Sequence, residues 1–385
     1  MEHTAQGADQ AQDLEIDRGE LSLVEVRVHA PAELADGQAR LAVERFGLSA
    51  NNVTYGVFGD MLQYWDFFPA ELPWGRVPVW GFGRVVESRS GELTEGRRVF
   101  GYLPMSTELV VEPGRVDEQG FSDVAEHRAA MAAAYSRYTF TDADRIHRDD
   151  REPHQLLLYP LFFTSFVIDD FLDDRGFGAE QCWLSSASSK TSIGTAFLLR
   201  RRGAGTVVGL TSPGNRAFVE SLDVYDHVLA YDEVAGLAPA SAVYVDVAGD
   251  DAVTRAVHTH LGDGLAHSMR VGGTHWDQEP DAAAQAGEPL PGPAPEFFFA
   301  PAQLAKRAHE WGKDVLDERV AEAWHAYADW VDGWITFEHH EGADAVTATW
   351  RDLVANRADP RVGHVCTLAP AGGTDPAGQG EEGAP

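Results

Sequence analysis

The sequence predicts an α/β protein with two folded domains, one rich in short β-strands and one built around a doubly wound parallel sheet. Short runs of alternating hydrophobicity, separated by glycine-rich turns, occupy residues 20–115, a pattern typical of β structure. Strands and helices alternate over residues 155–300, which indicates a parallel sheet. The 385 residues also exceed what one hydrophobic core usually holds.

The first domain is expected to contain strands at residues 21–28, 38–46, 81–88 and 98–102, because apolar residues alternate there. Between them lies an aromatic loop that includes Phe58, Tyr64 and Trp65. These three side chains are candidate substrate contacts in a pocket wall, although an aromatic cluster of this kind also suits a hydrophobic core. Residues 156–172 are strongly apolar and predict a buried helix before the second domain.

The second domain is organised around residues 181–216. A short apolar strand at 182–184 leads into a small polar loop at 185–192, then a helix and a second strand at 206–210. A βαβ unit of about thirty residues presents a helix N-terminus to a phosphate group. Of the usual fingerprint glycines only Gly194 remains. We therefore expect serine hydroxyls, backbone amides and Lys190 to form the anion site.

Two other interpretations of this loop stay open. Lys190-Thr191 follows a run of small residues, as in a Walker phosphate loop, but both glycines of that motif are missing. The loop also suits an ordinary strand-to-helix turn, in which serines cap helix amides without any ligand.

The remaining segments complete the domain assignment. We expect a disordered arm at 1–20, a β-rich substrate domain at 21–153 and a Rossmann-like nucleotide-binding domain at 154–300. Helices and a strand at 301–369 should return the chain to the first domain, and 370–385 should be a disordered tail. The crevice at the sheet's switch point is expected to open on a cleft between the two domains.

Composition excludes several classes of function. The chain has 61 acidic and 30 basic residues, a formal charge of −31, and such a field repels nucleic acids and anionic membranes. No run of eighteen apolar residues and no apolar leader occurs, so we expect neither a membrane span nor a signal peptide. The two cysteines, Cys182 and Cys366, cannot form a disulfide framework, which fits a reducing cytoplasm.

Two consecutive segments carry a family resemblance. Residues 78–88, Pro-Val-Trp-Gly-Phe-Gly-Arg-Val-Val-Glu-Ser, precede residues 93–102, Leu-Thr-Glu-Gly-Arg-Arg-Val-Phe-Gly-Tyr. They resemble the glycine-rich strand and Gly-Asp-Arg-Val turn of the medium-chain dehydrogenase/reductase superfamily, in its zinc-free quinone and enoyl reductase branch. Arg97 stands where aspartate is usual. Pro78-Val79-Trp80 replaces Gly-His-Glu, so the zinc-site histidine and glutamate are missing. The loop Ser-Ser-Ala-Ser-Ser-Lys-Thr at 185–191 also resembles that of a bacterial subfamily.

The resemblance covers nearly the whole folded chain. It implies a GroES-like domain joined to a Rossmann domain, a homodimer, and hydride transfer from NADPH to an activated double bond of an enone, enoyl or quinone-like molecule. Tyr55 matches a substrate-facing tyrosine, and Tyr55 or Asn52 would donate a hydrogen bond to the resulting enolate. The residues expected to bind cofactor are Asn51, Thr164, Ser186, Ser188, Ser189, Lys190, Thr191, Thr211, Ser212, Arg216, Ala248, Gly249, Gly272 and Phe298.

The preference for NADPH follows from the end of the second strand. NAD enzymes place an acidic residue there to bind the ribose hydroxyls, whereas this strand ends in Thr211-Ser212. Arg216 and Lys190 are two cations that can converge on a 2′-phosphate. The alternative is that Arg216 is a solvated helix-start residue and that Lys190 pairs with a surface acid.

Other constellations predict no further chemistry. The histidines at 258, 260, 339 and 340 lack the i, i+4 spacing of a zinc helix, so we expect no metal. No Gly-x-Ser-x-Gly nucleophile motif is present. Asp246 ends a buried strand and is expected to cap local turn amides. The competing functional hypothesis is a protein that keeps this fold but acts as a non-redox enzyme or a ligand-binding module.

Overall fold

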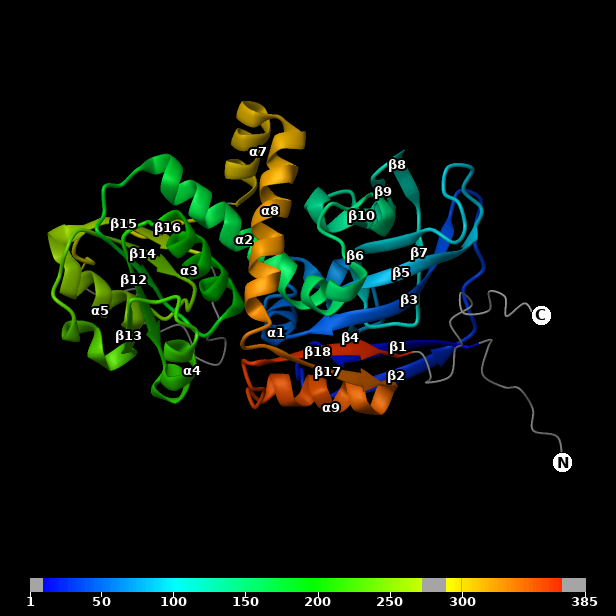
Figure 1. Cartoon of the computed structure of the whole chain (residues 1–385). Helices are drawn as coiled ribbons and strands as arrows, with labels where there is room; N and C mark the ends of the chain where they lie inside the picture. The colour runs from blue at the N-terminus through cyan, green and yellow to red at the C-terminus, as the bar shows by residue number, and fades with distance from the viewer. Residues whose placement is uncertain (1–9, 272–288, 299, 369–385) are drawn as a thin grey trace, which may run out of the picture. The chain divides into compact units, whose positions relative to one another are not determined.

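The computed structural model describes residues 10–271, 289–298 and 300–368. The chain divides into two compact units, which are described separately (Figure 1). Unit 1 comprises residues 1–144, 337–358 and 364–385, and unit 2 comprises residues 145–336 and 359–363. The sequence-based division at 153 and 300 therefore differs from the compact units, because the helices after residue 300 belong to unit 2 as far as residue 336.

Unit 1 is built from two sheets whose strands pair mainly in antiparallel fashion, while the neighbouring strands β17 and β18 are parallel. One has the order β2-β1-β4, and a nine-stranded sheet has the order β17-β18-β3-β5-β6-β10-β9-β8, with β7 paired to β3. The strands are β1 (Ala11–Asp17), β2 (Val24–His29), β3 (Ala39–Leu48), β4 (Trp74–Gly75), β5 (Pro78–Ser88), β6 (Arg98–Pro104), β7 (Glu108–Val111), β8 (Pro113–Asp117), β9 (Gly120–Asp123), β10 (Arg137–Phe140), β17 (Thr336–Glu341) and β18 (Val362–Thr367).

Alternation of apolar residues places the core of unit 1 between these strands. Phe46, Phe82 and Phe121 are fully buried, and so are the rings of Tyr102 and Tyr138. Two helices complete the unit, α1 (Ala50–Val57) and α9 (Ala343–Val354), and they contact each other. The predicted β-rich domain is thus confirmed.

Two local predictions in unit 1 were wrong. Residues 11–17 form β1, which pairs with β2, instead of continuing a disordered arm. Its apolar residues Leu14 and Ile16 are completely buried. The aromatic loop instead begins with helix α1, because Ser49 and Asn52 form a capping box at its start.

Unit 2 contains a six-stranded sheet with the order β13-β12-β11-β14-β15-β16, in which neighbouring strands are parallel throughout. Numbered from the first strand of the unit this is 3-2-1-4-5-6, the order of dinucleotide-binding Rossmann domains. The doubly wound α/β fold class is confirmed. The strands are β11 (Gln181–Leu184), β12 (Thr206–Thr211), β13 (His227–Ala230), β14 (Ala242–Asp246), β15 (Leu265–Arg270) and β16 (Glu296–Phe297).

The core of unit 2 lies where the sheet meets its helices. Trp183, Val208 and Tyr244, one from each of three neighbouring strands, share a buried cluster with Val257. The helices are α2 (Glu152–Arg175), α3 (Lys190–Arg202), α4 (Arg216–Ser221), α5 (Asp251–Leu261), α7 (Ala300–Trp311) and α8 (Lys313–Val331).

Helix α2 is the one described helix that is long and apolar enough to span a membrane, and half of its apolar stretch is buried within the protein. Core helices of globular proteins share both properties. In this helix, Phe162 and Ile168 are fully buried, and Phe162 stacks on Tyr327 of α8. These contacts give α2 a packing role in unit 2.

Gly194 allows α2 to approach α3 closely. A Cβ atom on this residue would lie 2.7 Å from Ser165 Oγ. That hydroxyl lies within hydrogen-bonding distance of two carbonyl acceptors, Thr191 at 2.8 Å and Leu161 at 3.0 Å, and shares its one hydrogen between them. The glycine kept by the loop therefore serves helix packing at this position.

Gly194→Val should lower the free energy of unfolding by about 1 to 3 kcal/mol, because the new side chain overpacks the contact with Ser165. Gly214→Val is the matched control, since a Cβ at Gly214 meets no atom within 4 Å. It should stay within about 0.5 kcal/mol of wild type. Urea denaturation followed by tryptophan fluorescence measures both. Equal losses in the two variants would contradict this packing account.

Candidate functional site

The loop after β11 lies at the switch point of the parallel sheet. Strand β11 pairs with β12 on one side and with β14 on the other. The chain therefore leaves β11 toward one edge of the sheet and later returns to β14 on its opposite side. In open α/β sheets, ligands bind beyond the carboxyl ends of the strands at such a point. Residues 185–191 occupy this position.

Ser185 connects the ends of β11 and β14. Its hydroxyl donates to Asp246 Oδ1 at 2.8 Å and accepts the amides of Val247 and Ala248, both at 2.9 Å. Asp246 also accepts the amide of Gly249 at 3.0 Å, which confirms that it caps the local turn. Ser185 and Asp246 are almost completely buried, so the network holds the two loops at the switch point in a fixed arrangement.

The next residues turn the chain into α3. Ser186 has a φ of 48°, a left-handed conformation in which glycine is usual. The Ser189 amide donates to the Ser186 carbonyl at 2.7 Å, and the Ser189 hydroxyl caps the amide of Ser192 at 3.2 Å. The amides of Lys190 and Thr191 lie in the first helical turn, where a helix leaves donors available to an anion.

The side chains of Ser188 and Lys190 both form hydrogen bonds within the protein. The Ser188 hydroxyl accepts a hydrogen bond from Asn215 Nδ2 at 3.1 Å. Lys190 Nζ donates to the carbonyl of Pro360 at 2.9 Å. Although Lys190 keeps some exposure, its ammonium group lies inside unit 2, and this burial lowers its pKa to about 8 despite the nearby Asp359. The group is therefore mainly protonated at neutral pH.

The end of β12 offers hydroxyls and one cation. Thr211 is 1% exposed, and its Oγ1 is a buried polar atom without a hydrogen-bond partner among the described residues. Ser212 follows it at the start of a short 3-10 turn, residues Pro213–Asn215. Arg216 Nε lies 2.9 Å from the Glu220 carboxylate, and Arg216 Nη1 lies 2.6 Å from the Glu233 carboxylate. A phosphate at Arg216 would compete with both carboxylates.

The other predicted cofactor residues are distributed along unit 2. Ala248 is buried beside the Ser185 network, and Gly249 adopts a φ of 70°. Thr164 lies on α2, where its hydroxyl contacts the Pro160 carbonyl at 3.4 Å. The amide of Phe298 donates to the backbone carbonyl of Arg270 at 2.9 Å. Gly272 lies outside the described residues.

In unit 1, helix α1 carries the predicted catalytic residues. Asn52 Oδ1 accepts the Ser49 amide at 2.8 Å, and Nδ2 donates to the Pro78 carbonyl at 3.0 Å. Both ends of this buried amide thus help to fix α1, which gives Asn52 a positioning role, and its role as a hydrogen-bond donor to the enolate stays a prediction. Asn51 lies one turn before Tyr55, and its interaction with the tyrosine hydroxyl partly opposes the rise that burial causes in the pKa of Tyr55.

Tyr55 lies in a cluster of aromatic rings. Its ring is 4.5 Å from that of Tyr64 and 5.8 Å from that of Tyr102. Tyr102 also contacts Trp80 at 5.1 Å and Tyr135 at 4.8 Å. We call these five residues the tyrosine cluster. Burial raises the pKa of Tyr55 well above its ordinary value, so its hydroxyl stays protonated and can act as a hydrogen-bond donor.

Two polar atoms of the tyrosine cluster are unsatisfied. Tyr102 Oη and Trp80 Nε1 are buried and have no partner with full hydrogen-bond geometry among the described residues, although both lie close enough to the Tyr55 side chain to affect its pKa. Buried donors without partners are costly. Such donors are suited to an incoming oxygen acceptor. Sequence reasoning identified Trp80 only as a replacement for a zinc ligand and missed Tyr102 and Tyr135.

The remaining aromatic candidates differ in burial. Phe58 ends α1 and is partly buried. Trp65 is 1% exposed, and its ring fills the space over Gly59 and Gly75, where added Cβ atoms would approach it to 2.1 and 2.5 Å. This packing gives Trp65 a place in the core of unit 1, as the alternative interpretation of the aromatic cluster expected, and its substrate contact stays a prediction.

Ser185→Ala should lower the free energy of unfolding by about 1 to 3 kcal/mol, because two amides and a carboxylate lose a buried partner. Ser188→Ala removes a hydroxyl bonded to the partly exposed Asn215 and should cost at most about 1 kcal/mol. Chemical denaturation of both variants measures the difference. If Ser185→Ala were no more destabilising than Ser188→Ala, the proposed network would not hold the switch point together.

Known structures share the fold across nearly the whole chain. S. aureus TarJ in complex with NADPH is 11% identical, with a TM-score of 0.54, and the match covers 93% of this chain and 98% of that one. CurK enoyl reductase is 12% identical, with a TM-score of 0.52 and coverage of 93% and 99%. The yhdH oxidoreductase from Salmonella enterica, in complex with NADP, is 15% identical, with a TM-score of 0.51 and coverage of 93% and 99%.

Comparison by sequence finds fewer relatives than comparison by structure. No protein of curated function matches it. A family model with the description "Protein of unknown function (DUF2855)" matches residues 46–359. This range includes α1, the tyrosine cluster and the whole parallel sheet of unit 2. The chain belongs to the DUF2855 family.

Proposed function

We propose that this protein is a zinc-independent, NADPH-dependent oxidoreductase of the medium-chain reductase type, which reduces an activated double bond of an enone, enoyl or quinone-like small molecule. The observation that carries the proposal is the serine loop at the switch point of a 3-2-1-4-5-6 parallel sheet. Solved proteins of the same fold include one described as an enoyl reductase and two complexes with NADPH or NADP.

The residues at the switch point suit a dinucleotide. The left-handed backbone of Ser186 replaces a glycine of the usual fingerprint, and the first-turn amides of α3 would bind the pyrophosphate. Ser188, Ser189 and Lys190 surround the same turn. Thr211 adds a buried hydroxyl without a partner at the end of β12, where the adenosine ribose binds in this fold.

The choice of NADPH rests on charge at the end of β12. This strand ends in Thr211 and not in a carboxylate, so no acid at that position would repel a 2′-phosphate. Arg216 is the nearby guanidinium, and binding a phosphate would require it to exchange Glu220 or Glu233 for the new anion. Glu233 is therefore a competitor for the proposed phosphate site.

Arg216→Ala should weaken NADPH binding roughly ten- to a hundredfold, because the 2′-phosphate loses its guanidinium partner. It should leave NADH binding nearly unchanged, because NADH has no 2′-phosphate. Glu233→Gln should strengthen NADPH binding, because it removes the competing charge. The glutamine can still accept the Ala230 amide that Glu233 accepts at 3.2 Å. Calorimetric titration of wild type and both variants with each nucleotide measures these effects. Tighter binding of NADH than of NADPH to wild type would contradict the phosphate assignment.

The tyrosine cluster is the proposed source of hydrogen-bond donors. A bound reduced nicotinamide would supply the hydride. Negative charge then develops on the substrate's carbonyl oxygen, which needs preorganised donors. Tyr55 keeps its proton because burial raises its pKa, and beside it Trp80 Nε1 and Tyr102 Oη lack a well-aligned acceptor within the described part of the chain. Asn52 positions Tyr55 by anchoring α1 to the Pro78 carbonyl.

Tyr55→Phe should reduce kcat/KM by about a hundredfold or more, the usual loss for one donor to a developing oxyanion. The assay follows NADPH oxidation with a small enone and with a benzoquinone. Tyr159→Phe is the control, because Tyr159 lies on α2 and packs on Phe163. A normal circular dichroism spectrum together with unchanged kcat/KM in Tyr55→Phe would contradict the donor role.

The same titration tests a second candidate function. Lys190 is bonded to Pro360, Arg216 is paired with two glutamates, and Ser185 and Ser189 are used within the protein. These contacts favour a chain that keeps the fold but acts as a non-redox enzyme or a ligand-binding protein. Binding of neither nucleotide by the wild-type protein would support this alternative.

A further inference from the structure

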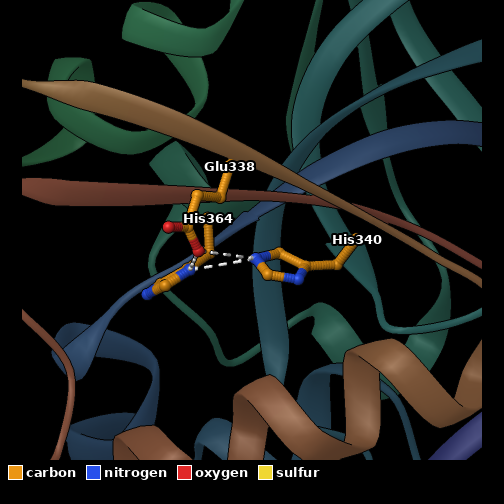
Figure 2. Close-up of side chains that lie close together, drawn as sticks. All are labelled: Glu338, His340 and His364. Atoms are coloured by element: carbon orange, nitrogen blue, oxygen red, sulfur yellow. Dashed lines mark hydrogen bonds and ion pairs between the residues drawn. The ribbon is translucent and has the colours of Figure 1, made fainter.

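Three potential metal ligands meet on strands β17 and β18 of unit 1, separately from the serine loop and the tyrosine cluster. His340 Nε2 lies 3.0 Å from His364 Nδ1. Glu338 Oε2 lies 3.9 Å from each of these nitrogens. Figure 2 shows the carboxylate and both imidazoles directed toward one common point. All three ligand atoms lie within 4.8 Å of one another.

The geometry follows from the pairing of the strands. The Thr336 amide donates to the Arg361 carbonyl, and the Gly342 amide donates to the Thr367 carbonyl. The residue numbers of donor and acceptor rise together from the first hydrogen bond to the second, so β17 and β18 run in the same direction. Glu338 and His340 are two residues apart and share one face of β17. The neighbouring strand brings His364 to that face (Figure 2).

The distances suit a small cation. Zinc binds histidine nitrogens at about 2.0 to 2.1 Å and carboxylate oxygens at about 2.0 to 2.2 Å. Two tetrahedral nitrogen ligands are therefore roughly 3.3 Å apart, close to the observed separation of 3.0 Å. Small rotations of Glu338, whose side chain is 58% exposed, would bring the carboxylate to the same ion.

We propose that Glu338, His340 and His364 bind a divalent first-row transition ion, with Zn²⁺ as the favoured occupant. Two imidazoles and one carboxylate form a three-ligand set that leaves a fourth position for water or another ligand. His340 also lines a surface cavity of about 190 Å³, to which Glu338 and His364 do not contribute. The ion would join β17 to β18 and stabilise unit 1 by binding the folded chain.

This site is independent of the hydride chemistry proposed above, which needs no metal. A second cluster, His147, Asp149 and Glu152, offers less to a transition ion. It has one imidazole, whose Nδ1 contacts Gln155 Oε1, a group outside the cluster, at 3.1 Å. It supplies a useful control for the first cluster.

The test is calorimetric titration of the chelator-treated full-length protein with zinc chloride. Wild type should bind one ion at this site, and His340→Ala and His364→Ala should each weaken binding at least about tenfold. His339→Ala is the matched control, because the adjacent exposed histidine alternates to the opposite face of β17. His339→Ala and His147→Ala should bind zinc as wild type does.

Two further measurements keep the test decisive if His364→Ala fails to fold. Cobalt chloride should give the visible absorption of a four-coordinate ion with wild type and His339→Ala, and not with the folded His340→Ala protein. Zinc should raise the Tm of wild type by about 2 °C or more and leave that of His340→Ala unchanged. No binding by wild type, or equal binding by His340→Ala and His339→Ala, would overturn the proposal and leave a simple histidine–histidine hydrogen bond.

Discussion

The hydroxyl of Ser185 is the contact on which the organisation of unit 2 depends. It joins two loops that come from different halves of the sheet, because it bonds to Asp246 and to the amides that follow it. With no solvent to compete, these bonds fix the ends of β11 and β14 relative to each other. The serine loop can therefore dispense with most glycines, since side-chain hydrogen bonds determine its path and Ser186 alone takes a left-handed conformation within it.

Unit 1 uses a related arrangement to fix α1. The amide of Asn52 caps the helix and reaches the backbone of β5, so Tyr55 is presented from a short helix with little freedom. The surrounding rings exclude water, which raises the tyrosine pKa and leaves two neighbouring donors unsatisfied. Buried, unpartnered donors cost stability in a resting protein. The proposed function assigns these donors to an oxygen atom of the substrate.

The fold class followed from the sequence because its periodic signals are local. Residues 182–184, 206–210 and 242–246 are apolar runs bounded by turns, and they form adjacent parallel strands. Strand β1 was not predicted because buried acidic residues interrupt its apolar pattern. Asp13 and Glu15 are 4% and 2% exposed, and they are held by Arg76 at 2.8 and 3.4 Å. Arg76 is distant in sequence, so no local pattern reveals the pairing.

The candidate sites were predictable to different degrees for the same reason. The serine loop is contiguous, so its residues could be identified together from the sequence. The relation of Asn51 to Tyr55 depends on helix α1, which the sequence analysis took for part of a loop. Tyr102 and Trp80 reach Tyr55 from β6 and β5, and His364 reaches His340 from another strand. Arg216 and Lys190 could be identified as cations, but their partners Glu233 and Pro360 depend on the three-dimensional fold.

The central claim is that the serine loop of unit 2 binds a dinucleotide phosphate. Hydrogen–deuterium exchange with and without NADPH tests it most directly, because bound amides exchange more slowly. The account predicts slower exchange in peptides that cover residues 185–191 and 247–249, with no change in peptides from β1 and β2. Unchanged exchange at residues 185–191 when NADPH is present in saturating amounts would contradict it.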